Sequence, residues 1–312
     1  MSTQGEPAKE PDLKGSTDMP VTSWIDRLPA PIRPYLILMR ADRPIGTWLL
    51  LLPCWWSIAI PGPSFPDPLL LLLFAIGAFV MRGAGCTVND LADRDFDAKV
   101  ARTAMRPIPS GAVSPKQALA FLCLLLLIGL IVLLQLNGFA ILLGAASLIL
   151  VAVYPFCKRF TYWPQFVLGL TFNWGALLGY AAVAGTLGAP AYLLYAAGLC
   201  WTLGYDTIYA HQDKEDDVMV GVKSSALRLG DRTRPFLFVI YALTLALLGG
   251  AGIAAELGPL FWPGLVLGAL HLFRQAATVK TDDPMDCLRH FKSNREVGLI
   301  LFVAIMGGHL WP

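Results

Sequence analysis

The sequence has few charged residues. Only 15% of its 312 residues are Asp, Glu, Lys or Arg, whereas 56% are hydrophobic. Because a soluble domain carries about 25% charged residues, this composition excludes an ordinary soluble protein and indicates an integral membrane protein. The net charge of +2 argues neither for nor against an anionic partner.

The sequence also lacks the cysteine and histidine motifs that are typical of disulfide-bonded or metal-binding proteins. The six cysteines are scattered with no Cys-x-x-Cys pair, so we interpret them as small apolar residues in or near the spans, not as disulfides or zinc ligands. The four histidines are too dispersed for a metal site, although His211 lies within an acidic segment.

The first residues contain no apolar core and are not an Arg-rich, acid-poor stretch. They therefore match neither a secretory signal nor a transit peptide. We expect residues 1–23 to form a disordered tail and residues 24–312 to form one membrane domain.

Long apolar segments account for most of the chain. A transmembrane helix needs roughly 17–25 residues, and residues 24–43 precede the first such segment as an expected interfacial helix. The predicted spans are 44–60, 69–88, 117–136, 138–156, 164–184, 190–210, 235–255, 259–274 and 296–311. The sequence thus predicts an all-α integral membrane protein with about nine transmembrane helices.

The basic residues fall on one side of these spans. All 24 Lys and Arg lie in or next to the tail and the connections near 87–116, 157–163, 211–234 and 275–295. The remaining connections and the C-terminus carry none. By the positive-inside rule, the basic connections are cytoplasmic.

An acidic segment follows the second apolar run. Residues 89–97 contain four aspartates. Asn89, Asp93 and Asp97 recur every fourth residue, so they share one face of a helix. Like charges one turn apart repel one another, and Mg²⁺ is the cation that suits clustered hard oxygen ligands. A solvated helix end is the simpler alternative.

A second acidic segment, residues 206–217, has the same character. Asp213 and Asp217 are again four residues apart, and Asp206 lies inside an apolar run. An aspartate there costs about 2.5–3.5 kcal/mol by insertion scales and usually lines a cavity or path, unless it reaches the interface. Four predicted spans separate the two acidic segments, so both emerge on the cytoplasmic face and can meet.

Lys and Arg side chains are interleaved with these acids. The positive-inside rule alone explains cytoplasmic cations, but carboxylates mixed with cations also suit Mg²⁺ and a bound diphosphate. Arg43, before Pro44, is a candidate for a substrate carboxylate. The cations near the segments are Arg82, Arg94, Lys99, Arg102, Arg106, Lys158, Arg159, Lys214, Lys223 and Arg228.

Three motifs together resemble the UbiA superfamily of membrane prenyltransferases. They are Asn-Asp-x-x-Asp-x-x-x-Asp at 89–97 with Arg102-Thr-x-x-Arg106-Pro after it, Asp213-x-x-x-Asp217, and Tyr154-x-x-x-Lys158. The segments around Arg43 and Asp206 are similar to the branch that acts on 4-hydroxybenzoate. The resemblance covers about residues 24–311.

The resemblance implies a ring of nine helices around a central, lipid-open cavity, capped by cytoplasmic loops. It implies that Asp206 faces the phenol and Arg43 the carboxylate of the aromatic acid, and that three residues contact the diphosphate: Tyr154, Lys158 and Arg102. The implied Mg²⁺ ligands are Asn89, Asp93, Asp97, Asp213 and Asp217. The implied catalytic residues are Asp93, Asp206 and Asp213.

The expected reaction is Mg²⁺-dependent transfer of a polyprenyl group to the carbon ortho to the hydroxyl of 4-hydroxybenzoate, for ubiquinone biosynthesis. The expected partners are these two substrates and the bilayer, with no nucleic acid. The expected location is a bacterial inner membrane, or else the mitochondrial inner membrane. The alternatives are another acceptor such as homogentisate or haem, and a cation-coupled transporter. A CDP-alcohol phosphotransferase would need an Asp-Gly-x-x-Ala-Arg that is absent.

Overall fold

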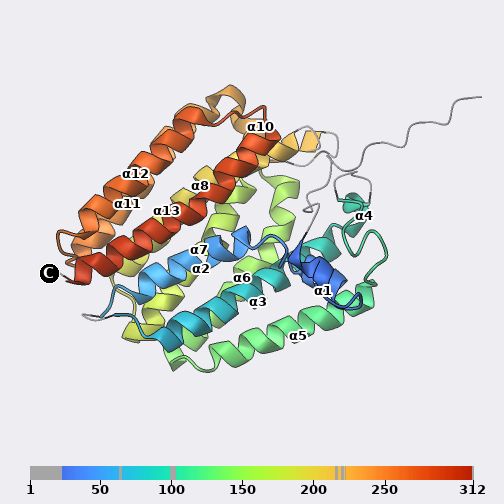
Figure 1. Ribbon diagram of the computed structural model, residues 1–312, viewed down its shortest axis with the longest axis horizontal. Helices are drawn as coiled ribbons and strands as arrows, with labels where there is room; N and C mark the ends of the chain where they lie inside the picture. The colour runs from blue at the N-terminus through green and yellow to red at the C-terminus, as the bar shows by residue number, and fades with distance from the viewer. Residues whose placement is uncertain are drawn as a thin grey trace, which may run out of the picture.

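The computed structural model describes residues 23–62, 65–98, 103–214, 217, 218, 221 and 223–310, and within these ranges all regular structure is helical. The predicted tail lies outside them except for Ser23. Each predicted span contains one long helix (Figure 1). These helices are α2 (Ile45–Ile58), α3 (Pro68–Ala92), α5 (Pro115–Leu133), α6 (Gly138–Phe160), α7 (Pro164–Ala184), α8 (Ala189–Ala210), α11 (Thr233–Ala254), α12 (Phe261–Thr278) and α13 (Pro284–Leu310).

Several helices begin where the sequence provides a cap. Before α5, the Ser114 hydroxyl accepts from the Gln117 amide, the Gln117 side chain accepts from the Ser114 amide, and Pro115 takes the first helical position. This capping box satisfies amide groups that have no partner inside the helix. At the end of α7, Gly185 adopts φ 69°, a left-handed conformation that glycine enters without steric cost.

Two predicted segments differ from the observed helices. The interfacial helix expected over 24–43 is two pieces, η2 (Trp24–Arg27) and α1 (Arg33–Leu38), because Pro29 and Pro31 fall between them and proline disfavours helix continuation. The last span, expected at 296–311, belongs to a longer helix that begins at Pro284. Its first half is polar, so a hydropathy criterion does not detect it.

Hydrogen bonds confirm the predicted division into two faces. On the basic side, Lys223 Nζ donates to Phe160 O at 3.4 Å and Arg234 Nη2 donates to Val279 O at 2.9 Å. On the other side, Asn137 Nδ2 donates to Ala181 O at 2.7 Å. The Gly258 amide likewise donates to Gly308 O at 2.9 Å. Each contact joins connections or adjoining span ends that the charge distribution assigns to the same face.

The long helices pack in two groups that share α2 and α7. The first group runs α2, α7, α8, α11, α12, α13 and back to α2, and its interior is filled by the fully buried Trp56, Trp201, Tyr205, Tyr241 and Phe261. In the second group, α3 packs on α2 and α5, and α6 packs on α7 and on α3. All six cysteines are free, as predicted.

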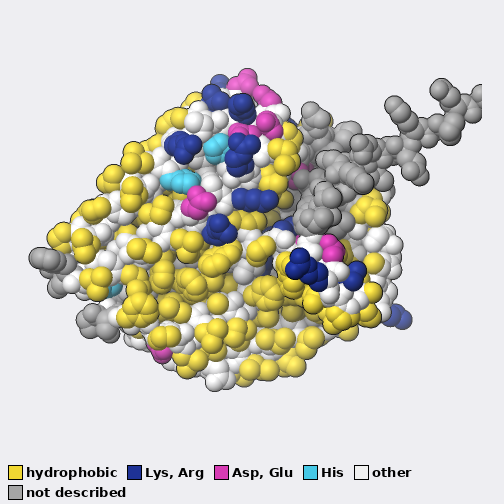
Figure 2. Space-filling view, viewed as in Figure 1, with side chains coloured by type: hydrophobic (Ala, Val, Ile, Leu, Met, Phe, Trp, Pro, Cys, Tyr) yellow, Lys and Arg dark blue, Asp and Glu magenta, His cyan; other side chains and the backbone are white. Residues whose placement is uncertain are grey.

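The outer surface is largely apolar. Helix α5 exposes a row of leucines and one isoleucine, among them Leu119, Leu127 and Ile131, and by length and composition the helices able to cross a bilayer include α3, α5, α7 and the run Ser225–Ala254 that ends in α11. In Figure 2 hydrophobic side chains cover most of the visible face, while charged ones gather at the connection from α12 to α13, along the first half of α13 and near α1. The protein is a multi-pass membrane protein whose charged side chains gather at one end of the helices.

Candidate functional site

The first acidic segment begins in the last turn of α3 and continues into the short helix α4 (Arg94–Asp97). Asp93 caps α3, and its amide donates to Asn89 O at 2.9 Å. The Asp97 amide donates in turn to Asp93 O at 2.8 Å. This spacing of hydrogen bonds keeps Asn89, Asp93 and Asp97 one helical turn apart, as predicted, although the helix is interrupted at Asp93.

Asp90 lies in a network of alternating charges. Arg40 Nη2 donates to Asp90 Oδ1 at 2.8 Å, and Arg106 Nη1 lies 3.4 Å from the same oxygen. Arg106 Nη1 also donates to Asp97 Oδ2 at 2.9 Å. Burial raises the pKa of Asp97 above its usual range; the Arg106 guanidinium acts in the opposite direction, and the charges of Asp90 and Asp93 add to the rise.

Arg40 has a strained backbone with φ 61°, a region that costs a residue other than glycine about 1–3 kcal/mol. Its Nη1 donates to Ile37 O at 3.1 Å and to Leu38 O at 3.4 Å. The guanidinium therefore caps the end of α1 while it neutralises Asp90. Arg40 connects the interfacial helix to the first acidic segment.

The second acidic segment starts inside α8 and continues into η3 (His211–Asp213). Asp206, in the last turns of α8, is partly buried. The charges of Arg82 on α3 and of Asp213 both act on Asp206. An arginine of α3 and the end of the second segment therefore both lie close to this carboxylate.

Tyr154 on α6 lies within electrostatic range of both segments. The charges of Asp206, Arg82 and Asp93 all act on its hydroxyl. Asp93 belongs to the first segment and Asp206 to the second, so both segments approach one tyrosine. The structure thus brings together four residues from α3, α6 and α8 at the cytoplasmic end of the helices.

Arg82 is a partly buried cation between these helices. Its guanidinium carbon lies 5.3 Å from the centre of the Phe172 ring on α7, a cation–π arrangement. A Cβ at Gly46 on α2 would collide with Arg82 Nε, so that glycine makes room for the guanidinium. Within the described ranges, Nε is buried and has no hydrogen-bond acceptor, and a buried donor without an acceptor is costly.

The predicted carboxylate contact, Arg43, pairs with its neighbour in the chain: Arg43 Nε lies 3.4 Å from Asp42 Oδ1. Lys158 lies on α6, but its side chain is outside the described part of the structure, and Arg102 is outside the described residues altogether. Among the described residues, no three His, Cys, Asp or Glu side chains form a group that could hold a metal ion.

Asp213 follows the buried His211 and the partly buried Gln212. His211 Nε2 lies 2.9 Å from the Thr233 hydroxyl at the start of α11. Burial lowers the pKa of His211 to about 4, and the charge of Lys214 lowers it further, against the opposing effect of Asp282. The imidazole is therefore neutral at physiological pH.

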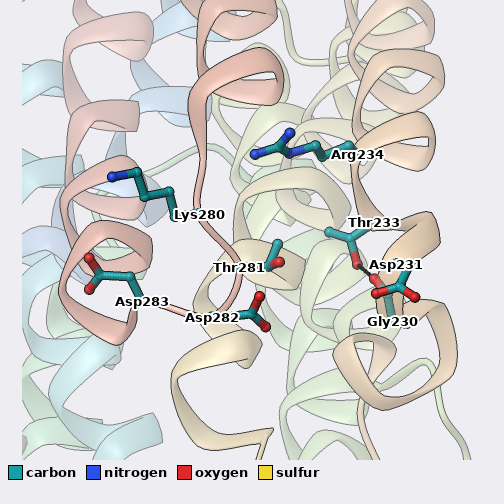
Figure 3. Close-up of a pocket in the computed structure, with 8 residues that line it drawn as sticks. All are labelled: Gly230, Asp231, Thr233, Arg234, Lys280, Thr281, Asp282 and Asp283. Carbon is teal, nitrogen blue, oxygen red and sulfur yellow. Dashed lines mark hydrogen bonds between the residues drawn. The ribbon is translucent and has the colours of Figure 1, made fainter.

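An open pocket of about 530 Å³ lies on the same face. Figure 3 shows that its lining comes from two segments, the turn Gly230–Arg234 and the loop Lys280–Asp283. None of the predicted site residues lines it. The acidic segments and the pocket are therefore separate features of this face.

From the sequence we assigned no role to Arg40 or His211, and we named Arg82 only as one of the cations near the acidic segments. The sequence alone could have indicated a functional role for Arg82, because this arginine interrupts an apolar run just as Asp206 does. A charged side chain at such a position has the same kind of insertion cost. Nothing in the local pattern distinguishes Arg40 or His211 from their neighbours, since their partners Asp90 and Thr233 are distant in the chain.

The fold resembles solved structures of UbiA homologues. An apo UbiA homologue from Aeropyrum pernix K1 matches with a TM-score of 0.68 and 26% identity over 85% of this chain and 98% of that one. A UbiA homologue from Archaeoglobus fulgidus, solved bound to GPP and Mg²⁺, matches with a TM-score of 0.65 and 19% identity over 88% of this chain and 99% of that one.

Sequence similarity extends over nearly the whole chain. A mitochondrial 4-hydroxybenzoate polyprenyltransferase of Caenorhabditis elegans is 51% identical over 93% of this chain and 82% of its own length. The proteins of the same name from Homo sapiens and Arabidopsis thaliana are 49% and 50% identical over 98% of this chain, and over 84% and 76% of their own lengths.

The model of the UbiA prenyltransferase family matches residues 50–304. That range contains both acidic segments, Tyr154 and Arg82, and the helices that surround them. The match confirms the family that the motifs indicated: the chain belongs to the UbiA prenyltransferase family.

Proposed function

We propose that the protein is a 4-hydroxybenzoate polyprenyltransferase, which joins a polyprenyl group to the ring carbon ortho to the hydroxyl and releases diphosphate for ubiquinone biosynthesis. The observation that carries this proposal is the identity of about one half to relatives of that name, over nearly the whole chain. The approach of both acidic segments to Tyr154 supports it.

The acidic residues suit Mg²⁺. Their donors are carboxylate and amide oxygens alone, the ligands that this cation prefers. Asp93 and Asp97 are buried next to further carboxylates, so a divalent cation would relieve their repulsion. The proposed ligands are Asn89, Asp93, Asp97, Asp213 and Asp217. When bound, Mg²⁺ supplies positive charge that stabilises the leaving diphosphate.

Positive side chains of the site would hold the diphosphate. We assign contacts to Tyr154, Lys158 and Arg102, which follow the family pattern. Arg106 and Arg40 lie beside the first acidic segment and already neutralise its carboxylates. The site thus offers cations in several positions around the proposed metal ligands, as binding of a polyanion requires.

The aromatic acid would lie next to Asp206. Asp206 would accept the phenolic proton as the ring carbon attacks. Arg43 is the predicted partner of the carboxylate, and Arg82 is a second candidate because its charge acts on Asp206 and its Nε is buried without an acceptor in the described part of the chain. An arginine fork binds a carboxylate through two parallel hydrogen bonds.

The reaction depends on stabilising the negative charge of the leaving diphosphate and on shielding the allylic cation from water. The allylic C–O bond breaks, and its electron pair leaves with the diphosphate. The allylic cation forms among apolar walls that exclude water, and the ring carbon forms the new C–C bond. The hydrogen on that carbon then leaves as the one proton released overall, and the phenolic oxygen regains the proton that Asp206 had accepted. Phe172 or Trp174 of α7 would be an aromatic neighbour of the cation, although the Phe172 ring is already in contact with Arg82.

A long prenyl chain explains the membrane location. Each buried CH₂ contributes about 0.8 kcal/mol to membrane binding, so a polyprenyl substrate stays in the bilayer. The relatives are named as mitochondrial, which favours the mitochondrial inner membrane over a bacterial one. By the positive-inside rule, the acidic segments would then face the matrix.

The test is an assay of membranes that contain the protein, with Mg²⁺, a labelled polyprenyl diphosphate and a panel of aromatic acids. We expect labelled product with 4-hydroxybenzoate and little with homogentisate or haem. Transfer to one of the other acceptors alone, or no transfer at all, would refute the proposal. Cation-coupled uptake into proteoliposomes without prenyl substrate would favour a transporter instead.

A further inference from the structure

A buried hydrogen bond joins the second acidic segment to a different part of the chain. His211 is the first residue of η3, and Thr233 is the first residue of α11. Their side chains meet with Nε2 and Oγ1 2.9 Å apart, and the residues are 5% and 1% exposed. No motif of the sequence contains this contact, and the proposed reaction does not use either side chain.

The direction of this hydrogen bond follows from the neighbouring one. The Thr233 hydroxyl donates its single proton to Gly230 O at 2.8 Å, which Figure 3 marks as a dashed line. Its oxygen can then only accept from the imidazole, so His211 carries its proton on Nε2. Within the described ranges His211 Nδ1 has no hydrogen-bond partner, and Thr233 is thus the one polar anchor of the ring there.

The position of Thr233 is fixed by the packing of the helix to which it belongs. Helix α11 packs along α8 more extensively than any other pair of helices does in the described residues. Gly230, whose carbonyl fixes the hydroxyl, has φ 50° at the end of α10 (Ser225–Leu229). By contrast, η3 is a single short turn after the end of α8. It also packs against α13, so the hydrogen bond to Thr233 adds a side-chain link to α11, and helix ends fray where such contacts are lost.

We propose that His211 and Thr233 are positioning residues that fix η3, and with it the direction in which Asp213 and Asp217 enter the site. This inference rests on the proposed function, since it assigns these aspartates to the metal. Loss of the hydrogen bond should leave the ligands present but poorly placed. Metal activation should weaken while binding of the aromatic acid stays unchanged.

The direct test replaces Thr233 in the full-length protein and measures the Kd for Mg²⁺ by calorimetry without substrates, together with prenyl transfer against Mg²⁺ concentration; the Kd and the half-maximal Mg²⁺ concentration should shift together. Thr233→Val keeps the shape and removes the acceptor, whereas Thr233→Ser keeps the hydroxyl. Thr244→Val is the matched control, because Thr244 lies on the same helix, is 1% exposed, and bonds only to Ile240 O among the contacts seen for its side chain.

We expect Thr233→Val to raise the Mg²⁺ concentration for half-maximal activity by about three- to tenfold, the range for one lost buried hydrogen bond. The KM for 4-hydroxybenzoate should not change. Thr233→Ser should restore the wild-type curve, and Thr244→Val should follow it. Identical Mg²⁺ curves for Thr233→Val and Thr244→Val would overturn the inference, as would a loss of activity with no shift along the Mg²⁺ axis.

A second pair of variants covers the case in which Thr233→Val does not fold. His211→Gln retains a side-chain N–H that can donate to Thr233, and His211→Leu does not. The inference requires a larger Mg²⁺ requirement in His211→Leu than in His211→Gln, and equal curves would contradict it. Wild-type transfer that persists in EDTA would refute the metal assignment itself; strict Mg²⁺ dependence with no effect of these variants would refute only the positioning role.

Discussion

Arg106 binds Asp97 through a 2.9 Å hydrogen bond, and the same nitrogen lies 3.4 Å from Asp90. Arg106 and Asp97 are both largely buried. Two carboxylates of one acidic segment therefore share a single guanidinium group. Because a buried carboxylate that loses its partner keeps its desolvation cost, this arginine is important for the stability of the segment.

Arg106→Gln should therefore destabilise the protein by more than about 1 kcal/mol. The matched control is Arg94→Gln, because Arg94 pairs with Asp95 at 3.4 Å on the surface, where both side chains are more than half exposed, and such pairs contribute about 0–1 kcal/mol. Thermal unfolding in detergent measures both. Equal melting temperatures for the two variants would contradict the prediction.

The proposed Mg²⁺ ligands of the two acidic segments give a second prediction. Asp93→Ala and Asp213→Ala should each abolish prenyl transfer, and EDTA should do so reversibly, because the proposed Mg²⁺ loses ligands or is removed. Asp95→Ala is the control, since Asp95 carries the same charge in the same segment but is 82% exposed and paired with Arg94. Full activity of Asp93→Ala, or loss of activity in Asp95→Ala, would exclude the proposed set of ligands.

Asp206 should act in the chemical step more than in diphosphate binding. Asp206→Asn keeps the size of the side chain and removes the proton acceptor, so we expect kcat to fall by roughly 10²–10⁴, the usual range for a general base. The KM for the polyprenyl diphosphate should stay near its wild-type value. A variant with normal kcat would show that Asp206 accepts no proton in the rate-limiting step.

The helices could largely be predicted from the sequence, because spans and their sidedness depend on local hydropathy and charge. Each predicted span contains a helix, and the division of basic residues matches the contacts on the two faces. The polar first half of α13 was missed, since its residues are stabilised by packing and not by lipid. The hydrophobic segment alone does not define the length of that helix.

The site could be predicted only in part. The four-residue spacing of Asn89, Asp93 and Asp97 is a local property, and the backbone preserves it. The partners of Asp90 could not be predicted, because Arg40 and Arg106 reach it from separate loops. Which arginine faces the aromatic acid likewise depends on how helices meet, and the structure adds Arg82 to the predicted Arg43.

The choice between these two arginines can be tested with an acceptor that lacks the carboxylate. An arginine that binds the carboxylate should discriminate 4-hydroxybenzoate from phenol, and its removal should lower that discrimination by about tenfold or more, the value of a charged hydrogen bond. Arg82→Gln and Arg43→Gln are compared by the ratio of kcat/KM for the two acceptors. We expect the larger change in Arg82→Gln, because Arg43 pairs with Asp42 whereas the charge of Arg82 acts on Asp206. A change in Arg43→Gln alone would assign the carboxylate to Arg43, and unchanged ratios in both would place it elsewhere.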